Sequence, residues 1–149
     1  MFIKKTNFLL FTLSILFICE IVKAANDLSL KKYLEEKNLE KASTQIYLLN
    51  RCSAVYAYSS ALTLKSDPEN SKKFIDIANN LLFKSVELKV IDNKEKLENA
   101  QKKAAKEREK LFKKYTADGK KNWNKNKSYF KGSYISSDIV ICTKLVNDR

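Results

Sequence analysis

The chain contains no histidine among its 149 residues. Histidine is the commonest general base and a frequent metal ligand, so its absence removes Ser–His and Cys–His catalytic pairs and most zinc sites. The two glycines, Gly119 and Gly132, lie too far apart to form a phosphate-binding loop. A serine–lysine pair is the one catalytic arrangement that the composition leaves open. We therefore expect no catalytic residue, metal or cofactor, and no enzyme.

Turn-forming residues are scarce: besides the two glycines, the chain has a single proline, Pro68. An all-β fold would need a turn about every 8–12 residues. Lysine, glutamate, alanine and leucine are abundant, and these residues favour helices. The sequence predicts an all-α fold, a small bundle of three to four helices, in a single domain over residues 25–149.

The N-terminus has the three-part layout of a secretory signal peptide. Lys4 and Lys5 precede an apolar run over residues 8–18, and small residues follow at Val22 and Ala24. We expect cleavage after residue 24 and export to the periplasm or the medium.

Two alternatives for this N-terminal segment are weaker. A retained membrane anchor needs roughly 20 apolar residues, whereas this run is shorter and Glu20 follows it. A lipoprotein would carry its lipid on Cys19, but that processing requires a small residue in the place of Ile18.

After such cleavage two cysteines remain, Cys52 and Cys142. An exported chain with an even number of cysteines favours a disulfide, and two buried thiols are the alternative. The disulfide would tie the C-terminal helix to the first helix of the mature chain. On the loop-entropy account it would contribute on the order of 4 kcal/mol.

Apolar spacing predicts a first helix from Leu28, capped by Asp27, to about Lys65, with a bend at Asn38. Within this helix, polar side chains crowd around Cys52. They form either a small polar pocket or hydrogen bonds across the bundle with an arginine in an ion pair. These side chains are Gln45, Asn50, Arg51, Tyr56, Tyr58, Ser59 and Ser60.

A second helix is expected to begin at Pro68, capped by Asp67, and to extend to about residue 117. A break near Asp92 is an equal alternative to one continuous helix. The pair Asp118-Gly119 predicts a helix stop, followed by a basic, aromatic loop over residues 118–136. Ser136 or Ser137 would cap a short terminal helix.

Positive charge is concentrated in one part of the chain. The mature chain has 26 basic residues against 16 acidic ones, and residues 102–131 alone hold twelve basic against three acidic. Such a surface attracts anionic partners. The candidate anionic-partner surface comprises Lys110, Lys113, Lys114, Lys120, Lys121, Trp123, Lys125 and Lys127.

Lysines interleaved with aromatics suit nucleic acid or an anionic membrane surface. Because the chain is expected outside the cytoplasm, we expect an acidic protein or an anionic envelope component, with peripheral membrane contact and no nucleic acid. The alternative is a solvated helix face, since only three basic residues are arginine and an AT-rich genome produces the same bias.

The sequence therefore favours a small exported helical protein with a binding role at the cell envelope. One alternative is an oligomerising coiled coil built on the thin apolar stripe from Leu97 to Tyr115, with a retained anchor. Another is a small exported enzyme inhibitor. The oligomeric state follows from none of these patterns.

Overall fold

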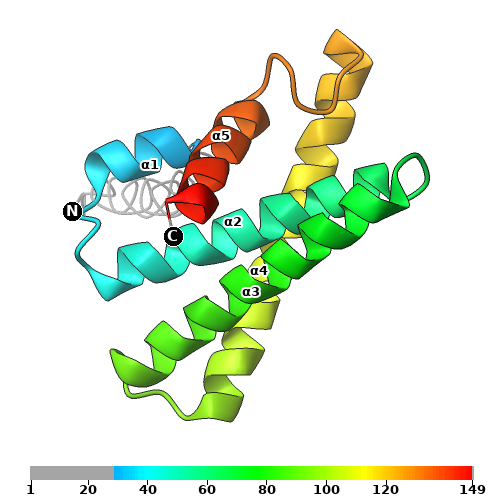
Figure 1. Cartoon of the computed structure of the whole chain (residues 1–149). Helices are drawn as coiled ribbons and strands as arrows, with labels where there is room; N and C mark the ends of the chain where they lie inside the picture. Colours follow the sequence, from blue (N-terminus) through cyan, green and yellow to red (C-terminus); the bar gives the residue numbers. More distant parts are fainter. Residues whose placement is uncertain (1–28, 149) are drawn as a thin grey trace, which may run out of the picture.

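The computed structural model describes residues 29–148, which form five α-helices and no strand (Figure 1). The helices are α1 (Leu30–Glu36), α2 (Ala42–Thr63), α3 (Pro68–Ile91), α4 (Leu97–Asn126) and α5 (Tyr134–Asn147). The all-α prediction is confirmed, but the predicted count of three to four helices is too low. The predicted signal peptide, residues 1–24, lies outside the described residues.

Helix α2 is the centre of the fold. It packs against α3, α4 and α5, and 14 of its 22 residues are buried. A helix covered on several sides has no single apolar stripe, which explains why apolar and small polar residues alternate around it. Helix α3 returns along α2, α4 crosses the pair, and α1 packs on α5 (Figure 1).

Both of the predicted long helices are divided by a short break, and this raises the helix count. The bend expected at Asn38 is a complete break, where the Asn38 side chain accepts a hydrogen bond from the Glu40 N–H at 2.8 Å. The second break follows Ile91, and Lys94 takes a left-handed backbone conformation there with φ 56°. The alternative of a break near Asp92 is therefore the one observed.

Helix caps agree with the sequence at α3 and differ from it at α1 and α5. Asp67 caps α3 and Pro68 is in its first turn, as predicted. Helix α5 is capped by Ser133 instead of Ser136 or Ser137. Helix α1 is capped by Ser29, and the predicted cap Asp27 lies outside the described residues.

The predicted helix stop at Asp118-Gly119 is wrong, because α4 continues to Asn126. The loop expected over residues 118–136 is correspondingly shortened to residues 127–133. Gly119 is buried within α4, against the Tyr58 side chain of α2. The glycine therefore serves the close packing of two helices and not helix termination.

This packing predicts that Gly119→Ala lowers the free energy of unfolding by about 1–3 kcal/mol or more, the usual cost of overpacking. A Cβ atom at residue 119 would lie 1.8 Å from Tyr58 Oη, so the ring or the helix must shift. Urea unfolding followed by circular dichroism measures the loss. Adding Tyr58→Phe should restore part of the lost stability, because it removes the hydroxyl oxygen. The relief is partial, since Cζ of the ring is still 2.8 Å from the added Cβ. Equal losses in the single and double variants would contradict this explanation.

The predicted disulfide is confirmed. Cys52 of α2 and Cys142 of α5 are joined, with their Cα atoms 5.3 Å apart, and both residues are fully buried. The bond ties the last helix of the chain to the central one, as expected. A buried disulfide is typical of proteins that fold in an oxidising compartment.

Candidate functional site

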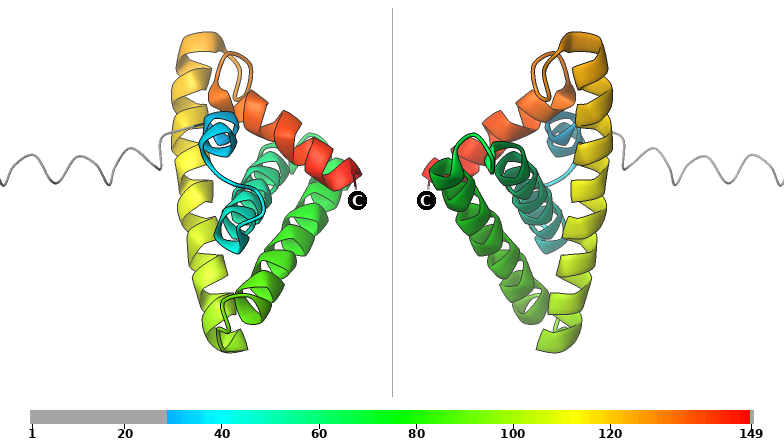
Figure 2. Two further views of the ribbon diagram at one scale, coloured as in Figure 1. Left: turned by 90° about the vertical axis from the view of Figure 1, so that its left-hand side faces the viewer. Right: turned by 90° about the vertical axis from the view of Figure 1, so that its right-hand side faces the viewer.

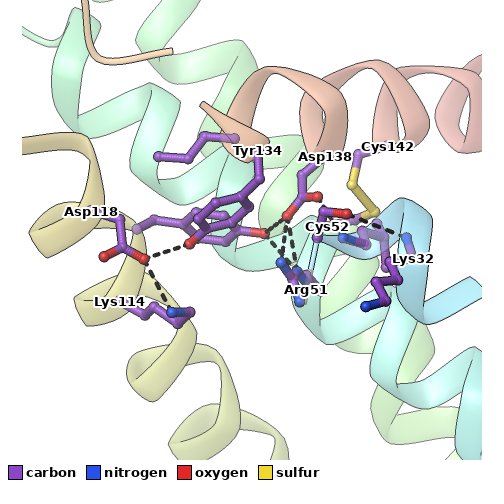
Figure 3. A network of polar contacts seen from close by, with 12 residues as sticks. Lys32, Arg51, Cys52, Lys114, Asp118, Tyr134, Asp138 and Cys142 are labelled. Atoms are coloured by element: carbon purple, nitrogen blue, oxygen red, sulfur yellow. Dashed lines mark hydrogen bonds and ion pairs between the residues drawn. A yellow bond between two sulfur atoms is a disulfide. The ribbon is translucent and has the colours of Figure 1, made fainter. Parts of the chain in front are cut away.

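Directly beside Cys52, Arg51 of α2 forms a buried ion pair with Asp138 of α5 (Figure 3). Arg51 Nη2 and Nε donate to the same oxygen, Asp138 Oδ2, at 2.8 and 3.0 Å. The two residues are 1% and 0% exposed. A pair so completely removed from water persists only when hydrogen bonds satisfy the rest of both groups.

Four further hydrogen bonds complete this cluster, and the first is from Arg51 Nε to Tyr115 Oη at 3.0 Å. Tyr115 Oη of α4 donates to Asp138 Oδ2 at 2.7 Å, and Arg51 Nη1 donates to Tyr47 Oη at 2.8 Å. The second carboxylate oxygen of Asp138 accepts the backbone N–H of Leu30 at 2.7 Å. The cluster therefore joins α1, α2, α4 and α5 at one point.

The guanidinium of Arg51 and the hydroxyl of Tyr115 both keep their protons near neutral pH, because the pKa of each group is raised. Burial alone would lower the pKa of Arg51, but the surrounding tyrosine hydroxyls and the Asp138 carboxylate raise it above its ordinary value. Burial raises the pKa of Tyr115 well above the usual range for tyrosine. Of the two alternatives for the polar crowding around Cys52, the structure shows hydrogen bonds across the bundle with Arg51 in an ion pair.

A chain of contacts links this cluster to the surface of α4 (Figure 3). The Tyr134 ring lies 5.6 Å from the Arg51 guanidinium, and Tyr134 Oη donates to Asp118 at 2.8 Å. Lys114 and Lys121 of α4 pair with the same carboxylate at 3.1 and 3.7 Å. Burial would raise the pKa of Asp118, but the hydrogen bonds from Tyr134 and Lys114 lower it. The carboxylate therefore anchors α4 to α5.

The side of α4 that points away from the core carries most of its lysines. At 3.6 residues per turn, the buried residues Ala104, Leu111 and Tyr115 fall on one side of the helix. Seven exposed lysines fall on the opposite side, and we call them the α4 lysine face. They are Lys102, Lys103, Lys106, Lys110, Lys113, Lys120 and Lys121.

Three lysines of this face are paired with acidic residues of the same chain. Lys103 pairs with Glu95 at 2.9 Å, Lys113 pairs with Glu109, and Lys121 contacts Asp118. The other four make no ion pair within residues 29–148, and these four are Lys102, Lys106, Lys110 and Lys120. The face therefore keeps a strong positive charge after its internal pairs are formed.

An exposed aromatic pair lies at the C-terminal end of the α4 lysine face. Trp123 stacks on Tyr129, with ring centroids 4.7 Å apart and an interplanar angle of 22°. Trp123 is 42% exposed. The N–H of Lys127, which is left-handed with φ 53°, donates to the Trp123 carbonyl and ends the helix there. The chain turns back at Lys127, one turn after Trp123, and brings Tyr129 against the Trp123 ring.

The structure places the predicted anionic-partner residues on one helix and its end. Lys110, Lys113, Lys120 and Lys121 are on the α4 lysine face. Lys125 is on one flank of this face and Trp123 on the other, while Lys127 caps the helix. Lys114 differs from the rest, since its side chain is only 25% exposed and pairs with Asp118.

Sequence reasoning left three lysines out of the candidate site. Lys102, Lys103 and Lys106 continue the same face toward the N-terminus of α4. Their spacing from Lys110 and Lys113, close to one or two helical turns, was the available signal. The wrong helix stop at Asp118-Gly119 concealed a different continuity, that of Lys110 and Lys113 with Lys120 and Lys121 on the same helix.

An apolar groove of about 580 Å³ lies elsewhere, between the ends of α2, α3 and α5. Two of its lining residues, Leu39 and Ile91, are 50% and 61% exposed. Among residues 29–148, the charged side chains that line it are Lys84 and Glu87. Most of the other lining residues are leucine or isoleucine, so the groove offers mainly apolar contact.

Two further kinds of site are absent from the described residues, 29–148. No group of His, Cys, Asp and Glu side chains is placed to hold a metal ion. In the same residues no helix is both long enough and apolar enough to cross a bilayer. In comparisons with known proteins, no protein-family model, curated protein or solved structure matches the chain.

Proposed function

We propose that this chain is an exported binding protein of the cell envelope, and that the α4 lysine face meets an anionic partner there. The observation that carries the proposal is the segregation of charge on α4. Seven exposed lysines lie along one side of the helix, opposite the side that packs on the core. Export is supported by the buried disulfide between Cys52 and Cys142.

The fold presents this face in a fixed position. Tyr115 of α4 is hydrogen-bonded to the buried pair of Arg51 and Asp138, and Asp118 joins α4 to Tyr134 of α5. A helix held in this way keeps its lysines in place before a partner arrives. Less conformational entropy is then lost on binding.

The first test measures binding to two anionic probes, vesicles that contain phosphatidylglycerol and soluble poly-L-glutamate. Affinity for the probe that binds should fall steeply as salt rises, because exposed charges are screened within about 10 Å at 0.1 M. The variant K102E/K106E/K110E/K120E reverses four lysines that make no ion pair in the described chain. Its affinity should fall by about a hundredfold or more, since each lysine near an anionic surface contributes roughly fivefold.

The matched control reverses four exposed lysines outside α4, in K31E/K65E/K72E/K144E. It has the same net charge as the α4 variant, so a difference in binding between the two variants reports where the lysines lie and not how many there are. Binding of the control should stay within several-fold of wild type. An equal loss in both variants, or binding of the α4 variant at the wild-type level, would contradict the proposal.

The oligomerising coiled coil receives less support from the structure. Its stripe runs from Leu97 to Tyr115, and of these residues Leu111 and Tyr115 are buried in the chain's own core. Ala100 and Ala104 pack against Val86 of α3. Leu97, at 57% exposure, is the large apolar side chain of this stripe that stays open to solvent. The stripe therefore packs α4 within its own chain.

A further inference from the structure

We propose that the anionic partner of the α4 lysine face is the surface of a phospholipid bilayer. Helix α4 would lie along the bilayer, with its lysines toward the phosphate groups and the Trp123–Tyr129 pair at the depth of the headgroups. This inference rests on the proposed function and narrows it from anionic partners in general to one of them. Three features of α4 carry it.

The first feature is the shape of α4 and its place in the molecule. With 30 residues it is about 45 Å long, and it forms one side of the molecule from end to end (Figure 2). From Lys102 to Lys121 the lysine face covers about 30 Å of this length. An extended, outward row of charges can meet many headgroups of a flat surface at once.

The second feature is the kind of cation on α4. Between residues 102 and 125 nine of the ten basic residues are lysine. The exception, Arg108, donates to Asn79 of α3 at 2.9 Å. Arginine is favoured where a carboxylate or phosphate is bound in a fixed bidentate geometry, whereas lysine acts as a point charge. A row of lysines therefore suits mobile lipid headgroups better than the fixed carboxylates of a folded protein.

The third feature is the exposed aromatic pair. Trp123 is one turn beyond Lys120, at the flank of the lysine face, and is 42% exposed while stacked on Tyr129. Tryptophan and tyrosine are enriched at the boundary between lipid and water, where the rings meet apolar chains and the polar atoms stay hydrated. In the sequence Lys127 lies between Trp123 and Tyr129, and Lys131 follows them, as expected beside anionic headgroups.

The test uses the protein purified as its host processes it, with Trp123 as the probe, since it is the only tryptophan in the chain. Vesicles of phosphatidylcholine mixed with phosphatidylglycerol should shift its emission to shorter wavelength. Lipids brominated near the headgroup should quench it. Vesicles of phosphatidylcholine alone and poly-L-glutamate should leave the emission unchanged. The K102E/K106E/K110E/K120E variant should lose the shift, and K31E/K65E/K72E/K144E should keep it.

A second variant tests the aromatic contact without relying on fluorescence. In vesicle sedimentation, Trp123→Ala should weaken binding about tenfold, which corresponds to roughly 50 Å² of apolar ring surface leaving water. The matched control is Phe83→Ala, which removes an aromatic side chain of 62% exposure from α3. It should bind as wild type does.

The outcomes separate this inference from the proposed function. Binding to poly-L-glutamate through the α4 lysine face without binding to vesicles would overturn the bilayer inference and support an acidic protein partner. Vesicle binding with no change in Trp123 emission and no loss in Trp123→Ala would also overturn it. If neither probe binds, the proposed function fails as well.

Discussion

Asp138→Asn is expected to lower the free energy of unfolding by about 3–5 kcal/mol, the usual cost of leaving one charge of a buried pair uncompensated. Asparagine keeps the shape of the side chain and can still accept the Leu30 N–H, so the change isolates the charge. Arg51 would remain charged and 1% exposed. It would lose its carboxylate partner and keep the uncharged hydroxyls of Tyr115 and Tyr47 as hydrogen-bond acceptors. Urea unfolding at neutral pH, followed by circular dichroism, measures the effect.

Two companion variants make this result interpretable. Asp76→Asn alters an exposed carboxylate of α3 and should change stability by no more than about 0.5 kcal/mol. The double variant R51M/D138L replaces the pair by apolar side chains, and it should be more stable than Asp138→Asn alone. If Asp138→Asn costs no more than Asp76→Asn, the ion pair does not hold α5 to α2.

The variant C52A/C142A is expected to lose about 4 kcal/mol, because the disulfide closes a loop of 90 residues in the unfolded chain. Both side chains are fully buried, so loss of packing adds to the loss of the cross-link. Urea unfolding with and without reductant separates the two contributions. The effect of reductant on the wild type gives the contribution of the cross-link, and the difference between reduced wild type and variant gives the contribution of packing. Without reductant the variant should unfold at a lower urea concentration than the wild type.

Reductant supplies the internal control for this prediction. It should lower the midpoint of the wild type and leave that of C52A/C142A unchanged, because the variant has no bond between residues 52 and 142 to reduce. Thiol alkylation of the unfolded protein confirms that reduction is complete. A fully reduced wild type that unfolds at its original urea concentration would show that the disulfide does not stabilise this fold.

Features with local causes were predictable from the sequence. Asp67 and Pro68 begin α3 because a carboxylate cap and a proline in the first turn act within a few residues. The disulfide was predictable because only Cys52 and Cys142 remain after residue 24. In both cases the number of alternatives was small.

Features that depend on tertiary packing were not predictable in the same way. Gly119 resembles a helix stop, and only the position of the Tyr58 ring shows that it is a contact point inside α4. The predicted end of the helix was therefore too early, and residues 118–126 were assigned to a loop although they belong to α4. A glycine has the same local preference in both settings, so the sequence around it does not distinguish them.

The partner of Arg51 lies between these two cases. An ion pair was among the alternatives for Arg51, but no partner was named. Asp138 is one helical turn before Cys142, and Arg51 directly precedes Cys52. Once the two cysteines are paired, these neighbours are brought together, so the disulfide itself was the signal for the ion pair.

The α4 lysine face can be tested directly by lysine protection. Acetylation of the lysines is read by mass spectrometry in the presence and absence of vesicles that contain phosphatidylglycerol. We expect Lys102, Lys106 and Lys120 to become less reactive when vesicles are present. The reactivity of Lys72 of α3 and Lys144 of α5 should not change. Protection spread evenly over all lysines, or concentrated on α3 and α5, would contradict the claim that the α4 lysine face is the binding surface.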